Sequence, residues 1–137
     1  MLKDPELRRR TKETAHRLFH TVKGGTDFET WKKFDKELAR DLSVFYTGVL
    51  YSREVISQKQ RELCALASLT VLHRPHELEV HIHAALNAGA SRREVAEVIF
   101  QQATYGGMPV VVDALNIYAR VLTERGEPFP EEDGAPR

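Results

Sequence analysis

A chain of 137 residues is long enough for one domain with a real core but short for two. Its 20 basic and 20 acidic side chains cancel, so no overall field favours nucleic acid or an anionic membrane surface as a partner. No apolar run approaches the roughly 20 residues that cross a bilayer, the N-terminus is charged, and the single cysteine excludes an internal disulfide, which together predict a cytoplasmic protein.

The first expected element is a charged helix that begins at Asp4-Pro5-Glu6, with a capping acceptor and a proline at the first helical position. It stops at Gly24-Gly25 and is rich in Lys and Arg. Because no aromatic residues are interleaved with these cations, we interpret it as a solvated or subunit-bridging helix rather than a nucleic-acid arm. It defines an N-terminal extension, residues 1–25.

A second helix is expected after Thr26 or Asp27. Apolar residues recur there at steps of three and four and predict one stripe facing the core, made of Phe28, Trp31, Phe34, Leu38 and Leu42. The aromatic and aliphatic segment 43–57 is interrupted by Gly48. We expect a broken helix there, because the rest of the chain offers no partner to a lone strand.

Capping boxes mark the helices of the second half. Ser57 with Gln60 predicts a helix over 58–73, and its partner begins at Pro75. This partner ends at Gly89. Ser91 with Glu94 then opens a third helix whose inward side chains are Val95, Val98, Ile99 and Gln102.

The turn over 105–109 leads into a last helix, from Val110 to about Arg125. We therefore expect an all-α fold of about six helices, with a domain over 26–125 and a disordered tail over 126–137. The segments 95–104 and 108–122 are apolar on more than one face, which predicts a homo-oligomer.

Most residues able to do chemistry lie between Lys59 and Ala90, which hold the only cysteine and four of the six histidines. Arg74, Glu77 and His81 form one stripe of the helix that follows Pro75, and Glu62 lies in the helix before it. These four residues are either a buried salt-bridge cluster that orients two helices or a proton relay. In the relay, His81 is the general acid or base and Arg74 anchors a substrate carboxylate.

A metal site is not expected. His76 and His81 are five residues apart, whereas the two histidines of HExxH are four apart. His73, Glu77 and His81 do follow a four-residue step, but Pro75 interrupts their helix. Elsewhere on this stretch, Glu79 and His83 are expected to form a solvated pair.

Cys64 lies among Leu63, Ala65 and Leu66, which predicts a buried, inert thiol. A redox role for Cys64 stays open because Glu62 is near in sequence. Such a role requires an exposed sulfur with a lowered pKa.

Three motifs resemble the carboxymuconolactone decarboxylase family, which includes the AhpD alkylhydroperoxidase group. They are RELxALA at 61–67, HExxxHxxAALNAGAS at 76–91, and Tyr-Gly-Gly-x-Pro at 105–109; the likeness covers roughly residues 38–122. In the AhpD branch a glutamate precedes Cys-x-x-Cys and a histidine. Counting from Glu62 places Arg74, Glu77 and His81 at those three positions, so both thiols of a two-cysteine peroxidase are missing.

The decarboxylase branch is the closer resemblance, since His76-Glu77, His81 and Ser52-Arg53 match its pattern. That resemblance implies helical hairpins assembled as trimers or hexamers, with no metal or organic cofactor. It also implies decarboxylation of a small carboxylated lactone.

The leading hypothesis is cofactor-free decarboxylation or proton transfer on a carboxylated lactone or enolisable acid. His81, Glu62 and Glu77 would be catalytic, and Arg74 and Arg53 would hold carboxylates. The alternatives are a non-catalytic oligomeric or ligand-binding member of the family, and thiol redox through Cys64.

Overall fold

A computed structural model describes residues 1–133 of the chain, and within them every regular element is a helix, which confirms the all-α class. In chain order the elements are α1 (Pro5–Phe19), α2 (Asp27–Trp31), α3 (Lys36–Ser43), the π-helix η1 (Val44–Tyr51), α4 (Gln58–Val71), α5 (Pro75–Asn87), α6 (Arg92–Gln101), α7 (Ala103–Gly106), α8 (Met108–Arg125) and the 3₁₀ helix η2 (Pro130–Asp133). Among these described helices, none is long and apolar enough to cross a membrane.

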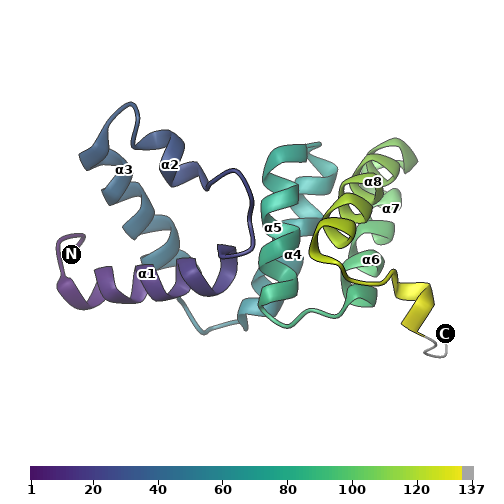
Figure 1. The fold of residues 1–137 in the computed structure, drawn as a ribbon, viewed down its shortest axis with the longest axis horizontal. Helices are drawn as coiled ribbons and strands as arrows, with labels where there is room; N and C mark the ends of the chain where they lie inside the picture. The colour runs from purple at the N-terminus through teal and green to yellow at the C-terminus, as the bar shows by residue number, and fades with distance from the viewer. Residues whose placement is uncertain (134–137) are drawn as a thin grey trace.

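The antiparallel hairpin of α4 and α5 lies at the centre of the molecule. Figure 1 shows α1, α2 and α3 on one side of it and α6, α7 and α8 on the other. The main core lies on the second side, where Leu66 and Ile82 of the hairpin pack with Ile99 and Leu122, all four fully buried. On the first side, α1 packs against both α5 and η1.

The turn between α4 and α5 sets the register of the hairpin. His73 adopts a left-handed conformation, with φ of 52°, and the amide of Arg74 donates to the carbonyl of Leu69. This is the bond pattern of a Schellman helix end. Pro75 then occupies the first turn of α5. Because proline cannot continue a helix from its N-terminal side, the chain forms two antiparallel helices here instead of one long helix.

The expectation of one apolar helix over residues 28–42 is wrong. The segment divides into α2 and α3 because the Asp35 side chain accepts hydrogen bonds from the amides of Glu37 and Leu38 and starts a new helix. Phe34 lies in the break and is 87% exposed, and Leu38 is 54% exposed, so neither belongs to the core.

The segment that follows is helical, as expected, but its first two turns form a π-helix, η1. Gly48 lies where η1 crosses α1. A Cβ atom at this position would overlap the Oγ1 atom of Thr11, which itself donates to the carbonyl of Leu7 at 2.7 Å. The glycine therefore permits the close contact of the two helices.

The capping boxes of Ser57 and Ser91 are both present, which confirms the predicted starts of α4 and α6. The turn predicted over 105–109 is shorter than expected: α7 ends at Gly106, and Gly107, with φ of 85°, is the only residue between it and α8. Part of the segment expected to be a disordered tail is the helix η2, which contacts α6; residues 134–137 of that prediction lie outside the described part of the chain.

Candidate functional site

A carboxylate and an imidazole meet between the two central helices. The Nδ1 atom of His81, on α5, lies 2.7 Å from the Oε2 atom of Glu62, on α4. The side chain of Glu62 is fully buried, whereas that of His81 is 19% exposed. With Glu62 as the hydrogen-bond acceptor, His81 carries its proton on Nδ1, which leaves Nε2 for a ligand.

The pair carries one unsatisfied atom. Oε1, the second carboxylate oxygen of Glu62, is buried and has no hydrogen-bond partner. Purely structural buried polar groups are normally satisfied, and each exception calls for an explanation. Thr70 Oγ1, on the same helix, is likewise buried without a partner, so the unsatisfied oxygen marks a free acceptor on Glu62 and does not by itself separate a proton relay from a pair that orients two helices.

His81 lines a cavity of about 320 Å³ on the N-terminal side of the hairpin. Five of its twelve lining residues carry Phe, Trp or Tyr rings. The lining residues are Ala15, Phe19, Thr26, Asp27, Phe28, Trp31, Ser43, Tyr46, Thr47, Tyr51, Val80 and His81. We name this space the His81 cavity.

Two aromatic rings hold the imidazole in place. The ring of Phe19 meets His81 edge to face, with ring centroids 6.0 Å apart, and the ring of Tyr51 lies 5.9 Å away at a 38° tilt. Burial raises the pKa of Tyr51 to about 12, and the negative charge of Glu62 acts in the same direction, whereas Arg61 opposes it. Tyr51 therefore presents a neutral hydroxyl group at neutral pH.

Three other predicted site residues do not line this cavity. Arg74 is exposed at the start of α5, Arg53 is exposed in the loop after η1, and Glu77 is half-buried on α5. The structure therefore brings together only Glu62 and His81 of the five residues predicted to act on a substrate. A spacing of three and four residues places side chains on one face of a helix, but it does not make all of them line the same cavity.

The histidines proposed for a metal point in different directions. His73 contacts Asp113 at 2.8 Å, His76 contacts Asp27 at 3.4 Å, and His81 contacts Glu62. Among the side chains that the structure describes, which end at residue 131, no three from His, Cys, Asp or Glu gather in a way that could hold a metal ion.

Two predictions about burial are wrong. Cys64 is exposed rather than buried, because it lies on the outer face of α4, and it is not part of the His81 cavity. His83 is buried at 2% exposure and is not in a solvated pair; Glu79 instead accepts a hydrogen bond from Arg120 at 2.9 Å.

His83 belongs to a polar network that sequence reasoning missed, which we name the α1 latch: Thr21, His83, Asn87 and Arg125. Asn87 Nδ2 donates to the carbonyl of Leu18 at 2.8 Å and to Thr21 Oγ1 at 2.9 Å. Arg125 also donates to Thr21, at 3.1 Å. Since Thr21 Oγ1 accepts twice, its own proton goes to Nδ1 of His83, 2.9 Å away.

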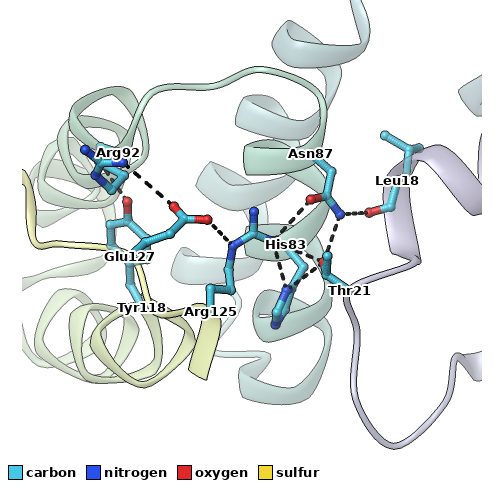
Figure 2. Close-up of polar contacts among 8 residues, drawn as sticks. All are labelled: Leu18, Thr21, His83, Asn87, Arg92, Tyr118, Arg125 and Glu127. Atoms are coloured by element: carbon cyan, nitrogen blue, oxygen red, sulfur yellow. Dashed lines mark hydrogen bonds and ion pairs between the residues drawn. The ribbon is translucent and has the colours of Figure 1, made fainter. Parts of the chain in front are cut away.

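Figure 2 shows Arg125 between the other three residues of the latch and the carboxylate of Glu127. Arg125 donates to Asn87 Oδ1 at 3.1 Å and to Glu127 at 2.6 Å. The latch thus ties the end of α1 to α5 and α8. Because Phe19 lies in that end of α1, the latch also fixes one wall of the His81 cavity.

The latch predicts a dependence of stability on pH. Burial lowers the pKa of His83, and the charge of Arg125 acts in the same direction, whereas Glu79, Glu124 and Glu127 oppose it. The unfolded chain therefore binds a proton at His83 before the folded chain does. The free energy of unfolding is expected to fall as the pH decreases below about 6.5 and to be retained above it.

The measurement is denaturant unfolding of the wild type and of His83→Asn at about pH 7.5 and about pH 5. The amide oxygen of asparagine keeps an acceptor near the position of Nδ1 but does not titrate. The wild type should lose more stability than the variant between the two conditions. Equal losses would contradict the role given to His83.

The fold and site define an all-helical protein in which a central hairpin joins a buried carboxylate to an imidazole at the wall of a small cavity. The chain belongs to the carboxymuconolactone decarboxylase family, whose family model matches residues 36–120. The match contains both Glu62 and His81. It does not include α1 and α2, which form much of the cavity wall.

Three relatives show the range of this similarity. An uncharacterized 15.0 kDa protein from the nqo9-nqo10 intergenic region of Paracoccus denitrificans is 32% identical over 81% of this chain and 84% of its own length. The 4-carboxymuconolactone decarboxylase of Acinetobacter baylyi is 29% identical over 72% of this chain and 73% of its own. The nitrosuccinic acid decarboxylase npaB of Metarhizium robertsii is 26% identical over 56% of this chain and 54% of its own length. At the level of the family, the chain is therefore similar to decarboxylases.

Proposed function

We propose that this protein catalyses cofactor-free decarboxylation, or the related proton transfer, on a small enolisable acid bound in the His81 cavity. The observation that carries the proposal is the 2.7 Å contact between the buried Glu62 and a histidine that lines a cavity. Similarity to two decarboxylases supports the reaction class.

The chemistry follows from the two ends of the imidazole. Loss of carbon dioxide breaks the bond to the carboxyl carbon, and its electron pair passes into the conjugated carbonyl group to form an enolate. Protonated His81 then delivers the proton on Nε2 to carbon. Glu62 accepts the hydrogen bond from Nδ1 throughout and stabilises the imidazolium form, and water returns the proton to His81.

Tyr51 adds a donor that the sequence did not reveal. Tyr51 lines the cavity and its hydroxyl group keeps its proton at neutral pH, so this group is suited to donate a hydrogen bond to the enolate oxygen. Sequence reasoning placed it only in a dense aromatic segment. No spacing rule connects that segment with α5.

The test is a panel of β-keto acids and carboxylated lactones incubated with the protein in heavy water. We expect carbon dioxide release above the uncatalysed rate for at least one compound, with deuterium at the carbon that lost the carboxyl group. Binding of panel members without release or deuterium incorporation would contradict catalysis.

That result would favour the second candidate, a non-catalytic ligand-binding member of the family. One observation supports this alternative: neither arginine nor lysine is among the residues that line the described cavity. The expected anchors for a substrate carboxylate, Arg53 and Arg74, lie outside it.

We further propose that the chain assembles as a homo-oligomer, a trimer or a hexamer. Large apolar side chains are exposed on three consecutive helices of the C-terminal side; they are Phe100, Tyr105, Met108 and Val112. These helices contact one another in chain order, and several exposed large apolar side chains on neighbouring helices are typical of subunit contacts. Sedimentation equilibrium measures the assembly, and a monomer at all concentrations would contradict it.

A further inference from the structure

The His81 cavity has a wall that fits a planar apolar molecule better than a polyanion. Phe28 and Trp31 come from α2, and Tyr46 comes from η1. The rings of Trp31 and Tyr46 lie 6.2 Å apart at a 49° tilt. Aromatic rings favour offset or edge-to-face contact with another ring, so this wall is suited to a planar ligand.

The charges around the cavity limit the number of carboxylates that a ligand can carry. The charged side chain on the lining is Asp27, which is negative, and His76 lies 3.4 Å from it. Arg61 lies over the Tyr51 ring, at 6.0 Å from its centroid, and donates to the backbone carbonyl of Arg53. Neither arginine is among the lining residues. Lys32 lies 5.5 Å from the centroid of the Phe28 ring, but it is also not among the lining residues, and it pairs with Glu29 at 2.6 Å.

One carboxylate can therefore be paired, through the Nε2 atom of His81. A second carboxylate would meet no Lys or Arg on the described lining. Its hydrogen-bond donors there would be neutral hydroxyl groups, those of Thr26, Ser43, Thr47 and Tyr51, and the carboxylate of Asp27 would repel it. Moving a carboxylate out of water to neutral donors beside a like charge is unfavourable or forces its protonation. The size of the cavity, about 320 Å³, also restricts the ligand to a compact molecule.

We infer that the ligand of the His81 cavity is a compact planar, mostly apolar compound with at most one carboxylate, bound against the wall formed by the rings of Phe28, Trp31 and Tyr46. This inference rests on the proposed function, because the carboxylate meets the same His81. It places selectivity in α2, which precedes the matched family region, and in η1, which lies within it.

Three probes with one ring and increasing charge test the ligand class: benzoate, benzene-1,3-dicarboxylate and benzene-1,3,5-tricarboxylate. Trp31 is the single tryptophan of the chain, so its fluorescence reports on the cavity wall. Isothermal titration calorimetry provides the affinity. We expect benzoate to bind at least about ten-fold more tightly than the dicarboxylate, and the tricarboxylate more weakly still.

Phe28→Ala should weaken benzoate binding about ten-fold, through the lost ring contact. Phe34→Ala is the matched control, because Phe34 is 87% exposed and outside the cavity. The affinity of this variant for benzoate should equal that of the wild type. Tighter binding of the dicarboxylate, equal effects of the two variants, or no binding of any probe would overturn the inference.

These binding measurements do not depend on turnover. Charge selectivity without decarboxylation of any acid would remove the proposed reaction and leave the ligand class in place. Turnover of a lactone with several carboxylates would remove the inferred ligand class and leave the proposed reaction in place.

Discussion

His81→Ala is expected to lower the rate of decarboxylation by about 10²- to 10⁴-fold, which is the contribution that general acid–base catalysis by one side chain typically makes. The variant removes the group that delivers the proton. It also leaves the fully buried carboxylate of Glu62 without its partner, so a loss of stability is expected as well, and circular dichroism and sedimentation establish that the variant is folded and assembled before its rate is compared. The measurement is carbon dioxide release with the best compound of the panel.

His16→Ala is the matched control, since His16 is exposed on α1 and does not line the cavity, and its rate should be unchanged. Glu62→Gln separates charge from orientation. The amide oxygen of glutamine can still accept the hydrogen bond from Nδ1, but it carries no negative charge to stabilise an imidazolium. An intermediate loss of rate is therefore expected. Full activity of His81→Ala would remove this residue from the mechanism.

Arg125→Ala is expected to lower the free energy of unfolding by about 2 to 3 kcal/mol, because it leaves hydrogen-bond acceptors of a part-buried network without a donor. The side chain of Arg125 is 15% exposed, and its guanidinium group donates to Glu127, Asn87 and Thr21. Its loss detaches the end of α1 from α8. Denaturant unfolding at fixed protein concentration measures the effect.

Arg120→Ala provides the comparison on the same helix. Arg120 is 54% exposed and pairs with Glu79 at the surface, so its removal should cost less than about 1 kcal/mol. Equal effects of the two substitutions would contradict the latch. The Arg125 variant should also show weaker benzoate binding, because α1 carries Phe19 to the cavity wall.

Short-range patterns were sufficient where the cause of the structure is local. The capping boxes at Ser57 and Ser91 satisfy backbone amides within three residues, so the starts of α4 and α6 follow from the sequence. The same reasoning failed over residues 28–42. There the apolar spacing outweighed Asp35 in the prediction, although its carboxylate starts a new helix.

The candidate site divides along the same line. Glu62 and His81 could be paired from the sequence because one short turn joins their helices, and Pro75 marks where the second helix begins. Arg74 and Glu77 share a stripe with His81 in the sequence pattern. In the structure, His81 is the one residue of that stripe that lines the described cavity, and Arg74 and Glu77 do not line it.

The sequence by itself determined the helical class, the central hairpin, the family and the acid–imidazole pair, because these depend on local capping, periodicity and motifs. Only the tertiary structure decided the contents of the cavity wall, the burial of His83 and the exposure of Cys64. The physical reason is that each depends on which helix packs against which. Phe19 and Tyr51 meet at His81 from distant parts of the chain, and no local rule specifies that contact.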